Sequence, residues 1–315
     1  MKARSIAREL ALLGVSQLSD NATASAASSR MVGRSDGRET VTQKVTAKPS
    51  TDALNALLKK ALTALAAEAQ ETIETAEGEM QRGNRLILES ETRTVESKEV
   101  RSRILPAIPL VEAAINRVGN TLEMLMFTQQ ADRKGMVAAK RALKDAAERV
   151  EIADRLMHEH EQKVLDIETV RTQIESAIST VQQSLIGIKQ ALIPEHLTNL
   201  ISHEEIRDYA CSLLYNWIQH WQAIDAQLDE AMEKWTIRRL ARVDRDILRL
   251  AMIDIVYLNV PKKVAIDEAI EIAKRYSDED GYRFINGVLR RATDKLEEAT
   301  ASSKTKAEIL GSELG

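Results

Sequence analysis

The stretch that decides the fold is PKKVAIDEAIEIAKRYSDEDGYRFINGVLRR, residues 261–291. Apolar residues recur at helical spacing from Val264 to Ala273 and again from Phe284 to Ala292, with charged residues at the remaining positions. Between the two runs, Ser277–Gly281 is polar and contains a glycine, so it breaks the helical pattern. The stretch therefore predicts two short helices joined by an acidic turn, with Pro261 at the start of the first helix.

The aromatic residues are concentrated in one part of the chain. Every Trp, Tyr and Phe except Phe127 lies between Tyr209 and Phe284. Because large aromatic side chains dominate globular cores, the packed domain is expected in the C-terminal third. The rest of the 315 residues is rich in Ala, Glu, Gln, Lys and Arg, and the whole chain has only five prolines. This composition predicts long helices and an all-α protein.

Charge and cysteine usage limit the compartment and the class. The formal net charge is -4, yet residues 1–50 carry eight Lys or Arg against four Asp or Glu, a weak indication of nucleic-acid binding. Cys211 is the only cysteine, so no internal disulfide can form, and a reducing cytoplasm fits. No apolar run approaches the length of a membrane span, and Glu9 interrupts any secretory signal. We expect a cytoplasmic protein without a membrane partner.

Residues 1–18 predict a short amphipathic helix that begins with cations. Lys2, Arg4 and Arg8 crowd its start, where positive charge opposes the helix dipole, so an anionic partner could compensate them. A solvated polar face is the alternative. Residues 19–50 lack apolar periodicity and are rich in Ser, Thr, Ala and Gly, which predicts a disordered linker.

A helical segment is predicted over residues 51–202. Its first helix is expected to stop at Gly83, and its longest periodic run extends from Ala146 to Leu192 with steps of three and four. That run predicts a coiled coil or a long helix in an antiparallel hairpin, with His160 and Arg171 on the seam. His158 and His160 point to nearly opposite sides of a helix, so they are not expected to bind a metal together.

Residues 203–297 predict the packed core. Within them, a helix over 235–258 is too apolar for a surface position and is expected to lie at the centre. Residues 298–315 form a polar tail that is expected to fray. The chain shows no glycine-rich phosphate loop, no Cys/His ligand set and no catalytic triad. Binding is therefore favoured over catalysis, with no metal or cofactor.

A series of residues between Trp235 and Leu289 keeps the order and spacing of a known family. It comprises Trp235, Arg239-Leu240, Val243-Asp244-Arg245, Ile247-Leu248-Arg249, Pro261, Val264-Ala265-Ile266, Glu268-Ala269, Ala273-Lys274 and Phe284-Ile285-Asn286-Gly287-Val288-Leu289. The series resembles the bacterial transcription antitermination factor NusB, and the first helix is similar to that family's first helix. The resemblance implies a pair of small helical bundles, here interrupted by a long helical, coiled-coil-like insertion.

The resemblance also implies a function and its residues. The family binds boxA RNA of ribosomal transcripts together with the ribosomal protein NusE and acts on the RNA polymerase elongation complex. The implied RNA-binding residues are Lys2, Arg4, Arg8, Asp280, Arg283 and Phe284. Ser16 and Asp244 match positions that face NusE. Phe284 could stack on an unpaired base or belong to the core.

Two departures from the family pattern concern binding strength. Ser16 stands where the family usually has an aromatic residue, and Asp267 stands where it usually has Asn. Two other functions stay open. In the first, the protein is a coiled-coil scaffold that self-associates through the insertion and uses the NusB-like part only for docking. In the second, it is the helical RNA-binding domain of a ribosomal RNA methyltransferase, although no methyl-donor domain follows.

Overall fold

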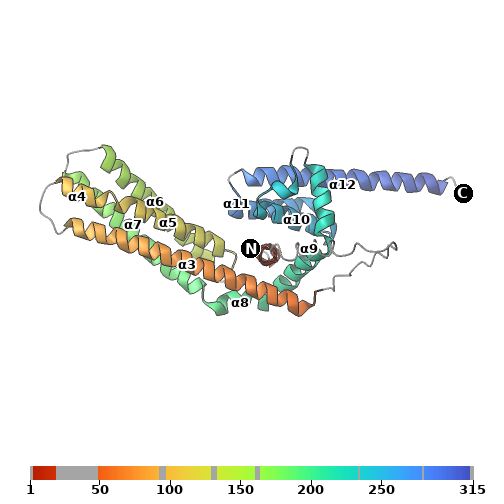
Figure 1. Ribbon diagram of the computed structural model, residues 1–315, viewed down its shortest axis with the longest axis horizontal. Coiled ribbons are helices and arrows are strands. Elements are labelled where there is room, and N and C mark those ends of the chain that lie inside the picture. Colours follow the sequence, from red (N-terminus) through yellow and green to blue (C-terminus); the bar gives the residue numbers. More distant parts are fainter. Residues whose placement is uncertain are drawn as a thin grey trace, which may run out of the picture. The chain divides into compact units, whose positions relative to one another are not determined.

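A computed structural model describes residues 3–18, 49–91, 97–128, 133–159, 164–232, 235–278 and 280–312. All regular structure in these ranges is helical, which confirms the predicted all-α class. The chain divides into two compact units (Figure 1). Unit 1 is Leu62–Leu200, and unit 2 joins Lys2–Ala61 to Ile201–Gly315. The predicted linker lies almost wholly in residues 19–48, outside the described ranges.

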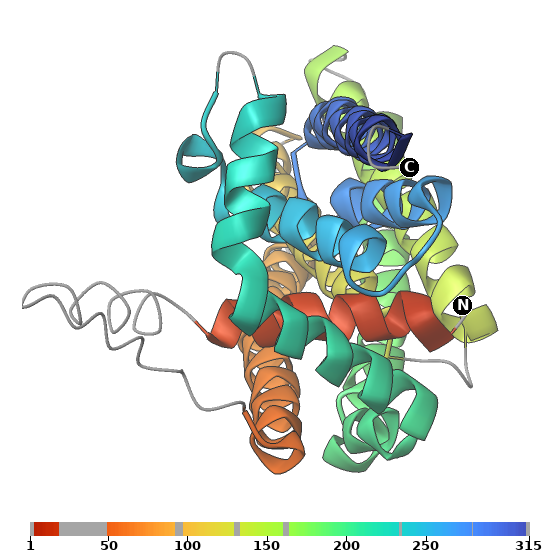
Figure 2. The same ribbon diagram turned by 90° about the vertical axis from the view of Figure 1, so that its right-hand side faces the viewer.

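Unit 2 contains the two helices predicted for residues 261–291 and the elements that pack around them. They are α1 (Ala3–Gln17), the first turns of α3 (Thr51–Glu91), α9 (Glu204–Ala231), a 3-10 turn η1 (Ile237–Arg239), α10 (Arg242–Val256), α11 (Lys262–Tyr276) and α12 (Gly281–Ser312). Helix α10 packs against α1, α9, α11 and α12, and every residue from Asp246 to Asp254 is buried (Figure 2). The predicted central helix is therefore present, although it begins at Arg242 because Leu240 and Ala241 are extended.

The end of α10 explains the sharp reversal into α11. Asn259 has a φ of 54°, a left-handed conformation that Asn tolerates better than most residues. The amide of Leu258 donates to the carbonyl of Ile253 at 3.1 Å, and that of Val260 donates to Asp254 at 2.9 Å. Pro261 then precedes the first residue of α11, as the sequence predicted.

Helix α1 packs closely against α9 and the first turns of α3. On its apolar side, Ile6 and Leu10 are completely buried. A Cβ atom on Gly14 would lie 3.0 Å from Leu214 Cδ1 and 3.4 Å from Leu58 Cδ2, so a larger residue there would force these side chains apart. The first turns of α3, up to Ala61, thus belong to unit 2, whereas the sequence assigned everything from residue 51 to the insertion.

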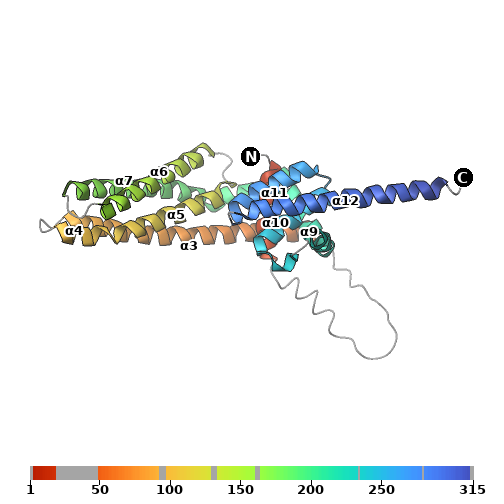
Figure 3. The same cartoon turned by 90° about the horizontal axis from the view of Figure 1, so that it is seen from above.

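Unit 1 is a bundle of long helices. It holds the rest of α3, α4 (Ser97–Ile104), α5 (Ala107–Leu125), α6 (Arg133–Glu159), α7 (Val164–Ala191) and most of α8 (Pro194–Ser202). Figures 1 and 3 show α3, α5, α6 and α7 running alongside one another. Ion pairs join α3 to its neighbours, at 3.0 Å between Glu79 and Arg117 and at 2.5 Å between Glu77 and Lys189.

The longest periodic run forms two helices, α6 and α7, which pack side by side more extensively than any other pair. Arg149 of α6 donates to Gln173 Oε1 of α7 at 3.3 Å, on the exposed side of the pair. Their apolar stripes, including Val150 and Ile174, are buried within unit 1. Of the two predicted polar seam residues, His160 lies outside the described residues. Arg171 donates to the carbonyl and hydroxyl of Ser90 at the end of α3.

Two local predictions differ from the structure. Helix α3 continues past Gly83 to Glu91, because Gly83 allows a close approach to α5: a Cβ there would lie 3.0 Å from Val111 Cγ2. Helix α12 extends to Ser312, beyond the expected start of fraying near residue 298. The added segment has no proline, so no residue in it prevents the helix from continuing.

Candidate nucleic-acid interface

The cations at the start of α1 have different surroundings. Lys2 lies outside the described residues. Arg4 is exposed, and its guanidinium carbon lies 5.2 Å from the centre of the Tyr209 ring. Arg8, one turn further on, is only 5% exposed, and its guanidinium carbon lies 5.4 Å from the same ring. Tyr209, near the start of α9, is therefore flanked by both arginines.

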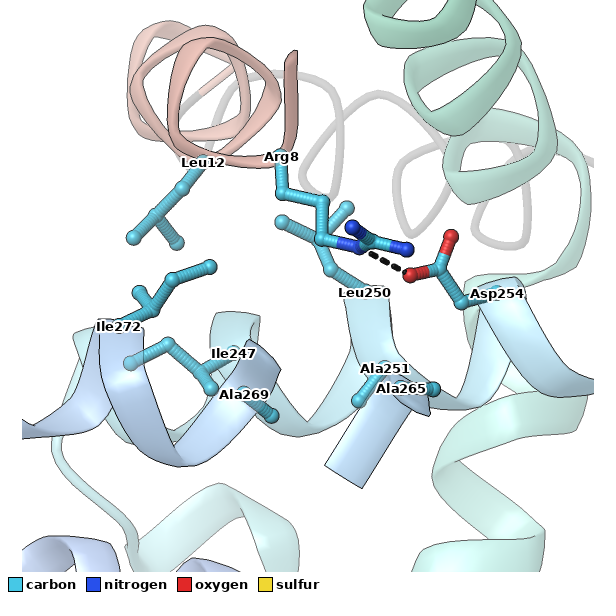
Figure 4. Close-up of a pocket in the computed structure, with 9 residues that line it drawn as sticks. All are labelled: Arg8, Leu12, Ile247, Leu250, Ala251, Asp254, Ala265, Ala269 and Ile272. Carbon is cyan, nitrogen blue, oxygen red and sulfur yellow. Dashed lines mark hydrogen bonds and ion pairs between the residues drawn. The ribbon is translucent and has the colours of Figure 1, made fainter. Parts of the chain in front are cut away.

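Arg8 is the centre of a buried polar network. Its Nε lies 2.5 Å from Asp254 Oδ2, its Nη1 lies 3.5 Å from Glu268, and its Nη2 donates to the hydroxyl of Tyr209 at 3.2 Å. The Tyr209 hydroxyl in turn donates to Asp254 Oδ1 at 2.6 Å. Figure 4 shows Arg8 reaching from α1 toward Asp254 at the end of α10. The network thus ties α1 to α9, α10 and α11.

Burial changes the proton affinity of this network. It raises the pKa of Asp254 above its ordinary value, and the opposing effect of Arg8 and of the Tyr209 hydroxyl does not cancel it. Burial, followed by the hydrogen bond to Asp254, also raises the pKa of the Tyr209 phenol. The positive charge of Arg8 offsets part of the cost of burying the Asp254 carboxylate.

The sequence placed Arg8 among the phosphate-binding residues, and the structure revises that picture. Its guanidinium is enclosed and faces two carboxylates, so it has little surface left for a nucleic acid. Arg4 keeps an exposed guanidinium. Sequence reasoning missed Tyr209 and Asp254. The available signal was an acid, Asp254, among the apolar residues of a central helix, where an uncompensated charge is costly.

Glu9 provides a second link between α1 and α11. Its carboxylate is 1% exposed, and its Oε1 lies 2.6 Å from Arg275 Nη2. The hydroxyl of Tyr276 donates to Oε2 at 3.2 Å. Burial raises the pKa of Glu9 to about 7, against the opposing charge of Arg275. Since Tyr276 ends α11, Glu9 connects α1 to the residue that immediately precedes the acidic turn.

The acidic turn carries the remaining predicted RNA-binding residues. Asp280 and Arg283 are exposed, and Arg283 Nη1 donates to Asp280 Oδ1 at 3.2 Å. Phe284 is half-buried, which leaves part of its ring accessible. Sequence reasoning missed Tyr282, whose half-buried ring lies 5.6 Å from the guanidinium carbon of Arg283 and 6.0 Å from Lys274 Nζ. The start of α12 therefore combines two aromatic rings with two cations.

The two predicted partner-facing residues lie at neighbouring helix ends. Ser16 is exposed near the end of α1, and its carbonyl accepts a hydrogen bond from Arg242 Nη2 at 2.8 Å, at the start of α10. Asp244 lies in the first turn of α10 and is half-buried. A Cβ atom on Gly281 would lie 3.6 Å from Asp244 Oδ1. The start of α10 therefore joins both residues to the start of α12.

No metal or cofactor site emerges from the described residues. They contain no group of three or more His, Cys, Asp or Glu side chains placed to hold a metal ion. The cavity lined by Arg8, Leu12 and Ile272 measures about 10 Å³, roughly the space of one water molecule (Figure 4). None of the described helices is both long and apolar enough to cross a membrane.

Comparisons with known proteins agree with this architecture. The family model described as the NusB family matches residues 168–294. A transcription antitermination protein NusB from Microcystis aeruginosa is 32% identical over 96% of this chain and 97% of its own length. The proteins of the same name from Crocosphaera subtropica and Gloeothece citriformis are each 32% identical over 93% of this chain, and the alignments cover 95% and 94% of their lengths.

These alignments extend through the insertion, so the relatives are of similar length and the insertion is not peculiar to this chain. No solved structure matches this chain. The ion pair of Arg8 with Asp254 and the helix pair around the acidic turn lie within the first helix and residues 235–289, which resemble the family. The alignment with relatives covers almost the full length of the chain. The chain therefore belongs to the NusB family.

Proposed function

We propose that this protein is a non-enzymatic, RNA-binding transcription antitermination factor of the cytoplasm. It binds boxA-type single-stranded RNA together with NusE and acts on the RNA polymerase elongation complex. The observation that carries the proposal is the exposed Arg4 beside Tyr209, on a helix that the buried Arg8 network holds against three other helices. A cation held in this way can meet phosphate without a large loss of conformational entropy.

The RNA contacts combine phosphate binding and stacking. Arg4, with Lys2 two positions earlier in the sequence, pairs with phosphates, and this contribution weakens as salt rises. Arg283 supplies a third cation. The exposed part of Phe284, with Tyr282 nearby, offers a surface on which an unpaired base can stack.

Asp280 tunes this interaction because it holds Arg283 in an ion pair 3.2 Å long. A phosphate that binds Arg283 competes with that carboxylate. Asp280 is therefore expected to lower the affinity for non-specific RNA. Exposed ion pairs of this kind contribute little to stability. An RNA that makes several contacts can therefore displace Asp280 from Arg283.

NusE is proposed to bind where Ser16 and Asp244 lie. Ser16, near the end of α1, and Asp244, in the first turn of α10, both lie near the acidic turn. One partner can therefore touch this region while RNA occupies the neighbouring residues. Ser16 supplies a small hydroxyl that already donates to the Leu13 carbonyl at 2.7 Å. Its contribution to NusE affinity is expected to be small, and Asp244 carries the charged contact.

The test is a binding titration with a boxA RNA and a scrambled RNA of the same composition, each with and without NusE. We expect preference for boxA, and a stronger preference with NusE. The Arg4→Gln variant should bind boxA several-fold more weakly, with a salt dependence that is lower by about 0.7 in log–log slope, the contribution of one phosphate contact on a single strand. Arg85→Gln, an exposed arginine of unit 1, is the matched control.

Equal affinity for boxA and scrambled RNA in the presence of NusE would refute the proposal. The scaffold alternative rested on the apolar heptads from Ala146 to Leu192. In the described part of these heptads the stripes of α6 and α7 are buried against other helices of the same chain, so they do not require a second copy.

A further inference from the structure

Helix α6 begins with a strongly basic segment in an otherwise acidic unit. Residues 133–144, RKGMVAAKRALK, contain five Lys or Arg and no Asp or Glu. Over residues 62–200 as a whole, 22 Asp or Glu exceed 17 Lys or Arg. Five of those 17 cations therefore lie in the first 12 residues of one helix without an intervening acid, and the family resemblance assigns no role to that helix.

The cations share one side of α6. Lys134, Arg141 and Lys144 are all exposed. At about 100° per residue, steps of seven and three place them within about 80° of one another around the helix axis, and the separation of ten positions between the first and the last corresponds to about 15 Å. The opposite side, with Met136 and Leu143, is buried in the bundle. We call the three exposed cations the α6 basic face.

Local carboxylates neutralise this face only in part. Lys140, at its edge, pairs with Glu123 of α5 at 2.5 Å, and Lys144 Nζ lies 3.9 Å from Glu148. Among the described residues, Lys134 and Arg141 have no acidic partner. Lys134, in the first turn of α6, also opposes the helix dipole, so its charge costs stability in the free protein. An external polyanion would relieve both unfavourable terms.

We propose that the α6 basic face binds the phosphate backbone of RNA that flanks the segment held by unit 2. The inference rests on the proposed RNA-binding function and extends it to the insertion. A row of cations about 15 Å long suits several successive phosphates of one strand. Nothing in the row reads base edges, so the contact is independent of sequence and adds affinity to a transcript that unit 2 has already selected.

The experiment compares two RNAs and two double variants of the full chain. The short RNA contains the boxA segment alone, about 12 nucleotides, within the range that a single-strand binding surface covers. The long RNA adds flanking sequence on both sides. The test variant is Lys134→Gln with Arg141→Gln. The control is Arg82→Gln with Arg85→Gln, which removes two exposed arginines of α3 in the same unit. Affinities are measured at several salt concentrations.

The wild-type protein should bind the long RNA more tightly than the short one. The test variant should lose affinity for the long RNA several-fold, with a log–log salt slope lower by about 1.4 for two lost phosphate contacts, and bind the short RNA unchanged. The control should leave both affinities unchanged. Circular dichroism should show the same helicity for all three proteins, because none of the four side chains is buried.

Three results would overturn the inference. The test and control variants could bind the long RNA equally well, or the test variant could weaken both RNAs alike. The test variant could also retain RNA binding and lose association with the elongation complex, which would assign the face to an acidic protein. Failure of the proposed function is separate: it shows as equal binding, by the full chain with NusE present, of the short boxA RNA and a scrambled RNA of the same length.

Discussion

At the scale of single residues, the first helix contains both a surface cation and a buried charge only one turn apart. Arg4 and Arg8 lie on the same side of α1 and flank the same tyrosine ring, yet Arg4 is exposed while Arg8 is enclosed by Asp254 and Glu268. Side chains four residues apart on a helix are neighbours, so the two roles support each other. The buried arginine fixes the position of the helix, and the exposed one can act on a ligand.

Glu9 provides a prediction about pH. Its folded-state pKa of about 7 lies above its ordinary value of 4.5, so its contribution to stability is fully present below pH 4.5 and is lost as pH rises through 7. Between these values the free energy of unfolding should fall because of this group by up to about 1.4 kcal/mol per pH unit. Glu9→Gln should remove this part of the slope. Urea denaturation at several pH values measures it.

Other buried carboxylates, including Asp254 and Asp246, also have raised pKa values, so the wild-type profile alone does not isolate Glu9. The difference between the wild-type and Glu9→Gln profiles does, because the other groups are common to both proteins. If the two profiles ran parallel from pH 5 to pH 8, the assignment of this titration to Glu9 would be wrong.

At the scale of elements, α1 is attached to unit 2 by apolar packing and by two polar links. The apolar side of α1 is buried against α9, and Gly14 allows the close approach to Leu214. The polar links of Arg8 and Glu9 both reach α11, at Glu268 and at Arg275. Apolar packing supplies the free energy of docking, whereas the buried charges select one register because any other would leave a carboxylate unpaired.

The Arg8 network can be tested with a double-mutant cycle. Arg8→Met should lower the free energy of unfolding by about 3–5 kcal/mol, because Asp254 is then buried with only the Tyr209 hydroxyl beside it. Combining Arg8→Met with Asp254→Asn should recover part of the loss, since the uncompensated charge is gone. Denaturation midpoints with unchanged m-values provide the measurement. Strictly additive losses would show that the two side chains do not depend on each other.

At the scale of the whole molecule, the insertion forms a compact unit of its own and does not extend as a single rod. The α6–α7 pair, with α3 and α5, buries the apolar stripe that the sequence presented as a coiled coil. We expect the full chain to sediment as a monomer at micromolar concentrations, because that stripe is already covered. Sedimentation velocity over a range of concentrations tests this. A sedimentation coefficient that rises with concentration would favour the scaffold function.

The predictability of the site varied with the range of the interaction. Asp280, Arg283 and Phe284 lie within one turn of helix, and the sequence could place them together. The sequence also grouped Lys2, Arg4 and Arg8 at the start of α1, but it could not distinguish the exposed Arg4 from the buried Arg8. Burial of Arg8 depends on Asp254, 246 positions away, and on Tyr209, 201 positions away. Nothing local to α1 encodes either partner.

The sequence by itself determined that the chain is helical, that α1, α3 and α11 begin near residues 2, 51 and 262, and which family the chain belongs to. Helical periodicity, proline positions and motif spacing are properties of short segments. Only the tertiary structure decided how those segments pack. It ran α3 through Gly83 because α5 lies close to that glycine, and it separated the exposed cation of α1 from the buried one. These outcomes depend on contacts between residues that are distant in the chain. Such contacts form, and contribute to stability, only when the helices pack together.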